Sequence, residues 1–109
     1  MSKVITLSKE NFDETVFKSV LPVLVDFWAP WCGPCRMMSS VLDDLSVQFD
    51  GKMIVAKLDV GNPDHQIIAS QYQIQSIPAL KLFKNGQVAK EYFGYRDGGS
   101  FAKELESAL

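Results

Sequence analysis

The feature that most constrains this chain is the pentapeptide Trp31-Cys32-Gly33-Pro34-Cys35, which holds both of its cysteines. It stands between an apolar, strand-like run at residues 23–27 and a helix-like run that begins near Pro34. Proline suits the first turn of a helix, because its φ is already helical and its missing N–H is not needed there, so Cys32 is predicted at a helix N-terminus. That end of a helix favours negative charge, and the thiolate is the form of cysteine that attacks. Cys32 is therefore the candidate nucleophile, and Cys35, one turn later on the same face, can close a bond back to it.

Two other interpretations of the Cys-x-x-Cys pair stay open, namely a structural disulfide and half of a zinc site. A disulfide that closes only four residues removes little entropy from the unfolded chain and stabilises the folded state by about 2 kcal/mol, which makes it a weak cross-link. A zinc site takes about four ligands, and the only histidine of the chain is His65. We therefore favour thiol redox chemistry, predict no metal site, and expect His65 to be a solvated surface residue at the start of a helix.

Length and composition describe an ordinary globular chain. With 109 residues, 47% of them apolar and 22% charged, the chain is expected to form one domain over residues 1–109. The formal charge is −2 and no run of like charges stands out, so neither nucleic acid nor an anionic membrane is an expected partner. No signal peptide and no bilayer-spanning segment is predicted. Two cysteines without a larger disulfide framework suit a reducing compartment, and we expect a cytoplasmic protein.

Strand-like and helix-like patterns alternate along the chain. Asn85-Gly86 gives a hairpin turn signal between the last two strands. This order predicts an α/β fold with a central mixed five-stranded sheet, flanked by four helices on both faces and ending in an antiparallel edge hairpin. The predicted strands are residues 4–7, 22–28, 53–58, 77–83 and 88–93, and the predicted helices are 8–18 with Ser8 as N-cap, 34–49, 62–72 and 98–109.

Two charged residues interrupt strands that are otherwise apolar. Asp26 lies in the second predicted strand and Lys57 in the third, and a helical crossover joins these strands. Such crossovers usually return close to the starting strand, so the two side chains are expected to meet beneath the Cys-x-x-Cys pair. Burial of either charge alone costs several kcal/mol, which favours pairing or neutralisation. The alternative is that each side chain points to solvent at a strand end.

Four segments carry a family resemblance, in order and at the spacing of that family. They are residues 27–35 with Asp26 just before them, residues 55–60 around Lys57, Ile77-Pro78 followed by Leu80 and residues 83–86, and Gly94. On these segments the chain resembles the thioredoxin family over essentially its whole length. The resemblance implies the thioredoxin fold and the activity of a general protein-disulfide reductase.

The resemblance also implies a mechanism and partners. Cys32 would attack a disulfide of a target protein, and Cys35 would resolve the mixed disulfide and leave the pair oxidised as a redox-active disulfide. Asp26 would serve as general base or acid for Cys35, with Lys57 tuning its charge. No cofactor would be needed. The partners would be disulfide-containing target proteins and a thioredoxin reductase, either NADPH- or ferredoxin-dependent, and the chain would act as a monomer.

A target-binding surface follows from the same resemblance. Pro78, in the cis form, would lie against the cysteines and present the Ile77 backbone to an extended segment of the target. The remaining residues of this surface would be Trp31, Gly33, Pro34, Val60, Phe93, Gly94 and Tyr95.

Departures from the family pattern leave the redox potential and the choice of partner open. One of them, Lys81, introduces a charge into a strand that is usually apolar. The departures are Ser40, Gly61, Ala79, Lys81 and Tyr95.

Three other functions stay open. A disulfide isomerase or oxidant domain typically has a histidine between the cysteines, where this chain has Gly33-Pro34, and a glutaredoxin usually has Pro-Tyr there. A non-enzymatic binding subunit would use the fold without its thiols.

Overall fold

The computed structural model describes residues 1–109, and its strands and helices follow one another in the predicted order. Most elements begin and end within two residues of the expected positions. The elements are β1 (Ile5–Thr6), α1 (Phe12–Phe17), β2 (Val23–Trp28), α2 (Gly33–Gln48), β3 (Ile54–Asp59), the 3₁₀-helix η1 (Pro63–His65), α3 (Gln66–Gln71), β4 (Ala79–Lys84), β5 (Gln87–Phe93) and α4 (Gly98–Ala108).

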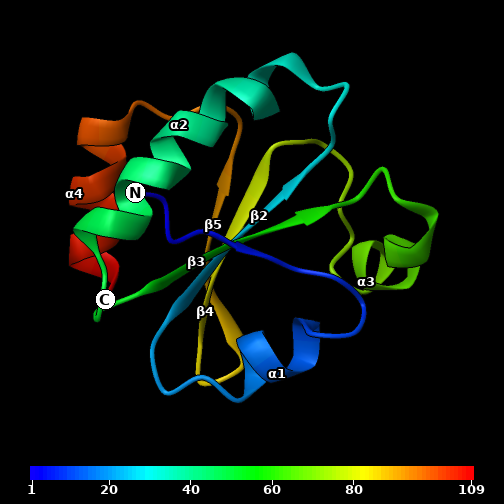
Figure 1. The fold of residues 1–109 in the computed structure, drawn as a ribbon, viewed down its shortest axis with the longest axis horizontal. Helices are drawn as coiled ribbons and strands as arrows, with labels where there is room; N and C mark the ends of the chain where they lie inside the picture. The colour runs from blue at the N-terminus through cyan, green and yellow to red at the C-terminus, as the bar shows by residue number, and fades with distance from the viewer.

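One sheet joins all five strands in the order β1-β3-β2-β4-β5. Strands β1, β2 and β3 run parallel, whereas β4 runs antiparallel to β2 and β5 antiparallel to β4. Figure 1 shows α2 and α4 on one side of the sheet and α1 and α3 on the other. The predicted mixed α/β sheet with an antiparallel edge hairpin is therefore confirmed. None of the helices is long and apolar enough to cross a membrane.

The central strand β2 sends apolar side chains to both faces of the sheet, because helices cover both faces. Leu24 packs in the core beneath α2 and α4, together with Leu45 and Phe101. Val25 and Phe27 point the other way, into the core beneath α1 and α3. A strand that is buried on both faces needs apolar residues at successive positions, which explains the continuous apolar run in the sequence.

The start of α1 differs from the prediction, because this helix begins at Phe12 with Asn11, and not Ser8, at the N-cap position. Ser8 forms a turn instead. Its hydroxyl accepts the N–H of Glu10 at 3.2 Å, and its own N–H donates to Oδ1 of Asn11 at 2.7 Å. These local bonds satisfy polar groups that a first helical turn would use, so residues 8–11 stay outside the helix.

The ends of four strands meet at one edge of the sheet. Because β2, β3 and β5 all run antiparallel to β4, their carboxyl ends lie beside its amino end. Backbone hydrogen bonds tie the adjoining loops together: the Val60 N–H donates to the Trp28 carbonyl at 2.7 Å, and the Gly94 N–H donates to the Pro78 carbonyl at 2.9 Å. This edge gathers the segments that the sequence singles out, although they lie far apart in the chain.

Candidate redox-active site

The two cysteines lie where β2 passes into α2. Cys32 is the N-cap residue of that helix, as predicted, and Pro34 lies in its first turn. A disulfide joins Cys32 to Cys35, with their Cα atoms 5.2 Å apart, and the Cys35 N–H donates to Sγ of Cys32 at 3.2 Å. An amide N–H and the helix dipole therefore point at the Cys32 sulfur, which favours a thiolate there after reduction.

Cys32 is the more accessible of the two cysteines. Its exposed fraction is 7%, against 2% for Cys35. The segment before β4 lies against it, with the carbonyl oxygen of Ile77 3.8 Å from Sγ of Cys32. The peptide bond between Ile77 and Pro78 is cis, in agreement with the family resemblance. A target disulfide that reaches this surface meets Cys32 before Cys35.

A cavity of about 250 Å³ lies beneath the disulfide and contains the two charged residues that interrupt the strands. Asp26 and Lys57 are direct neighbours in the β2–β3 register, so the prediction that they meet is confirmed at the level of the backbone. Asp26 is only 1% exposed, and its Oδ1 makes no hydrogen bond. The cavity lining is Asp26, Trp28, Cys35, Arg36, Ser39, Leu42 and Lys57.

Neutralisation, and not a direct ion pair, accommodates the buried carboxyl group. Burial raises the pKa of Asp26 to about 7, because the charged form loses its hydration, while the positive charge of Lys57 acts in the opposite direction. Lys57 makes no ion pair with it; its Nζ lies over the Trp28 ring instead, 5.2 Å from the ring centre. The carboxyl group shares a cavity with Cys35 and can exchange a proton near neutral pH.

The residues expected to bind the target surround the disulfide with different degrees of exposure. Among the large side chains of this set, Trp31 is the most exposed to solvent, at 73%. Pro78 is buried against the sheet, and its carbonyl oxygen accepts a hydrogen bond from the Gly94 N–H. Of the rest, Pro34, Phe93 and Tyr95 are exposed, while Gly33, Val60, Ile77 and Gly94 are half-buried.

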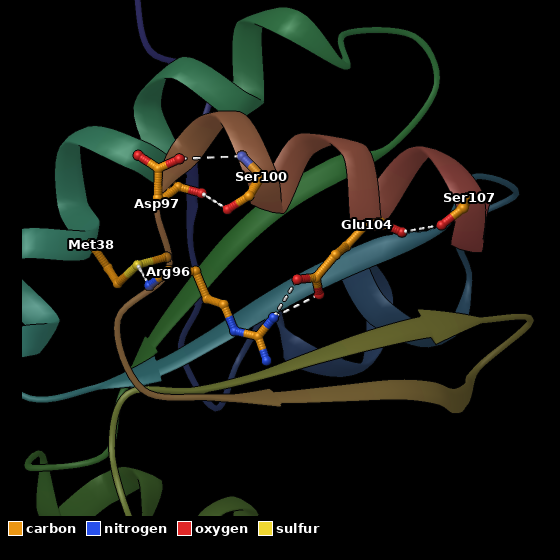
Figure 2. A network of polar contacts seen from close by, with 6 residues as sticks. All are labelled: Met38, Arg96, Asp97, Ser100, Glu104 and Ser107. Carbon is orange, nitrogen blue, oxygen red and sulfur yellow. Dashed lines mark hydrogen bonds and ion pairs between the residues drawn. The ribbon is translucent and has the colours of Figure 1, made fainter.

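A network of polar contacts holds the loop that carries Tyr95 (Figure 2). The Arg96 N–H donates to Sδ of Met38 in α2 at 3.3 Å, and its guanidinium donates to both carboxylate oxygens of Glu104 in α4, at 2.7 and 2.6 Å. The Asp97 carboxylate then caps α4 by accepting the Ser100 N–H at 3.3 Å. Two helices therefore fix the position from which the Tyr95 side chain projects.

Sequence reasoning did not identify some of the residues that line the cavity, and it was wrong about His65, which lies outside the cavity. Ser39 and Leu42 line the cavity, and their spacing of four and seven residues after Cys35 puts all three on one face of α2, a signal that was available. His65 is not a solvated surface residue, because it is buried and its Nδ1 lies 2.7 Å from the Asp59 carbonyl oxygen. No three His, Cys, Asp or Glu side chains gather in a way that could hold a metal ion.

Comparisons with known proteins agree with this geometry. A family model described as Thioredoxin matches residues 3–107. The chain is 48% identical to a thioredoxin of Synechocystis sp. over 110 residues, which cover 100% of both chains. It is 45% identical to a thioredoxin of Haemophilus influenzae over 94 residues, or 86% of both chains, and 42% identical to thioredoxin 1 of Nostoc sp. over 109 residues, or 100% of both.

We expect iodoacetamide to alkylate Cys32 of the reduced protein well before Cys35. Cys32 has the helix N-terminus and the greater exposure, whereas Cys35 lies inside the helix and faces the cavity. Peptide mass spectrometry after timed labelling at neutral pH measures both rates. Protein unfolded in urea serves as the control and is expected to label equally at both positions. Equal labelling in the folded protein would contradict the role given to the helix N-terminus.

We also expect Asp26 to make the oxidised protein less stable as the pH rises. The carboxyl group ionises near pH 3.9 in the unfolded chain and near pH 7 in the folded one. Between these values the folded state holds the extra proton, so the free energy of unfolding falls with rising pH, by roughly 4 kcal/mol in total. Above the pKa that Asp26 has in the folded protein, the free energy of unfolding falls no further through this group.

The variant Asp26→Asn removes this titration and nearly preserves side-chain volume. Urea unfolding at pH 4 and pH 8 is expected to show a stability gain for the variant that is larger at pH 8. Asp44→Asn, which removes an exposed carboxylate of α2, is the matched control and should follow the wild type. Parallel pH profiles for wild type and Asp26→Asn would show that Asp26 titrates normally.

Proposed function

The chain belongs to the thioredoxin family and is a protein-disulfide oxidoreductase with a redox-active Cys32–Cys35 pair, and we propose that Cys32 is the attacking thiol and Cys35 the resolving one. The observation that carries this assignment is the position of Cys32 at the N-terminus of α2, where it is more exposed than Cys35. The Cys32 thiolate attacks one sulfur of a target disulfide. A mixed disulfide forms, and the other target sulfur leaves as a thiolate.

The second step transfers the electrons. The Cys35 thiol loses its proton and attacks Sγ of Cys32, which forms the intramolecular disulfide and releases the first target sulfur as a thiolate. The target has then gained two electrons and the pair has lost two. A thioredoxin reductase, drawing on NADPH or on ferredoxin, restores the dithiol.

Asp26 accepts the proton of Cys35 in this step, and Lys57 tunes the charge of Asp26. The shared cavity supports this role, because the carboxyl group and Cys35 both line it. The pKa of Asp26, near 7, supports it as well, since a general base works best when its pKa lies near the operating pH.

The target segment binds in an extended form along the Ile77 backbone, beside Pro78. The 3.8 Å contact between Ile77 and Cys32 supports this, because a segment that follows Ile77 is held directly at the attacking sulfur. The exposed rings of Trp31, Phe93 and Tyr95 offer apolar contact area around it, together with Gly33, Pro34, Val60 and Gly94.

The protein acts as a single-domain monomer in the cytoplasm. A reducing compartment suits a dithiol that must be regenerated, and the chain has no other cysteine with which to form a structural disulfide. Gly33-Pro34 between the cysteines supports a reductase over an isomerase or an oxidant.

The variant Cys35→Ser is expected to trap targets as stable mixed disulfides on Cys32. Insulin, with exposed disulfides, and a non-reducing gel measure this directly. Multiple turnover should fall to the level of the uncatalysed reaction, because the serine hydroxyl cannot resolve the intermediate. Cys32→Ser is the control and should trap no target. Sustained turnover by Cys35→Ser would assign resolution to a different thiol.

The variant Asp26→Asn is expected to slow the second step, while the first stays intact. At pH 7 the rate of mixed-disulfide resolution should fall about 10²-fold, which is the low end of what a general base contributes. The wild-type rate should rise and level off as the pH passes through 7, since the ionised carboxylate is the base, whereas the variant rate should follow the Cys35 thiolate fraction alone and rise with no inflection near pH 7. Stopped-flow measurements from pH 6 to 8 test this, with Asp44→Asn as control. An unchanged resolution rate would remove Asp26 from the mechanism.

A further inference from the structure

A second cavity, also of about 250 Å³, borders the proposed target-binding surface. It lies where the loop before β4 meets the edge strand β5. Ser76 and Ala79, which flank Ile77-Pro78 on either side, belong to its wall, so it adjoins the segment that touches Cys32. The cavity lining is Tyr72, Gln73, Ile74, Gln75, Ser76, Ala79, Lys81, Glu91 and Phe93.

This cavity contains a nearly buried charge that the redox chemistry does not use. The Lys81 side chain is 7% exposed and forms an ion pair with Glu91, which is 48% exposed and directly opposite on β5. The Lys81 Nζ also lies over the Phe93 ring, 5.9 Å from its centre. Lys81 therefore sits deep in the cavity, with the Glu91 carboxylate between it and solvent.

Stability alone does not account for this ion pair. The neighbours of Lys81 on the same face of β4 are Ala79 and Phe83, both of them in the apolar core. An apolar side chain at position 81 would pack there, and an ion pair whose carboxylate is half exposed contributes little to stability. The placement of the pair in the wall of a cavity, next to the target surface, points instead to a role in binding.

We propose that this cavity is a subsite for the target polypeptide and that it takes a cationic side chain, Lys or Arg; the proposal rests on the function inferred above. An incoming side chain meets the Glu91 carboxylate first, because Lys81 lies beneath it. Lys81 occupies only one carboxylate oxygen of Glu91 and leaves the other free. The exposed ring of Phe93 provides a surface over which a second cation can lie.

An extended target segment can bring such a side chain to the subsite. Residues of an extended chain advance about 3.3 Å each, and every second side chain points to the same face. A segment bound along Ile77 therefore passes Ser76 and Gln75, two residues of the cavity wall, within a few positions of its reacting cysteine. The subsite selects among targets by sequence and leaves the chemistry at Cys32 unchanged.

Synthetic disulfide-bonded peptides test this selectivity. One position at a time, within four residues on either side of the reactive cysteine, carries Lys, Gln or Glu in an otherwise constant sequence. At one position we expect kcat/KM to be about two- to fivefold higher for Lys than for Gln, because partly exposed ion pairs have effects of this size. At the same position kcat/KM should be lower for Glu than for Gln.

Variants of the ion pair should change the order of preference. Glu91→Gln leaves Lys81 without its partner, so the preference should reverse in favour of Glu. Lys81→Met leaves Glu91 alone and should strengthen the preference for Lys. The double variant Lys81→Met/Glu91→Gln buries no unpaired charge and should show no preference. Lys90→Met removes a lysine from the same strand outside this cavity and should keep the wild-type order.

Equal rates for the three peptides at every position would overturn the subsite, and so would a preference for Lys that persists in the double variant. The proposed function is judged separately, by whether the wild type reduces the Gln peptides at all and Cys32→Ser does not. Loss of selectivity with reduction intact therefore removes only the subsite, whereas failure to reduce any peptide removes the function.

Discussion

The placement of the central strand β2 is the constraint on which the rest of the structure depends. It pairs with β3 on one edge and with β4 on the other, and helices cover both of its faces. Its register sets Asp26 beside Lys57, and its carboxyl end delivers the chain to Cys32 at the start of α2. The disulfide is therefore attached to a strand that is paired on both sides and packed on both faces, which holds Sγ of Cys32 in place relative to Ile77.

The same strand makes stability and reactivity oppose each other. An apolar residue at position 26 would pack, whereas the carboxyl oxygen Oδ1 of Asp26 finds no hydrogen-bond donor. The fold tolerates the group because it is neutral over much of the pH range, and a neutral carboxyl group is far less costly to bury than a carboxylate. The loss of hydration that weakens the fold at high pH is also what brings the pKa near 7. The proposed role of Asp26 in proton transfer and its expected destabilising effect thus have one physical cause.

The sequence carries information about those parts of the molecule that follow from local pattern. The period of the apolar residues predicts the order of strands and helices, and two charges in apolar strands predict that Asp26 and Lys57 are neighbours. The burial of His65 has no such signal, because it depends on how η1 folds back over the end of β3. There its ring contacts the Asp59 carbonyl oxygen, a partner that only the tertiary structure supplies.

The Lys81–Glu91 ion pair is the clearest example of a feature that the sequence does not predict. Counting outward from the Asn85-Gly86 turn places Lys81 opposite Lys90, which would set two like charges side by side. The observed register shifts by one residue between Leu82 and Phe83, and the shift brings Glu91 opposite Lys81. A bulge of this kind leaves almost no trace in the apolar pattern, yet it turns a repulsive pair into an attractive one. The Lys81–Glu91 pair in the second cavity therefore depends on one irregularity in the hairpin, and chains that share the fold without this bulge and these two side chains would lack the proposed preference for cationic targets.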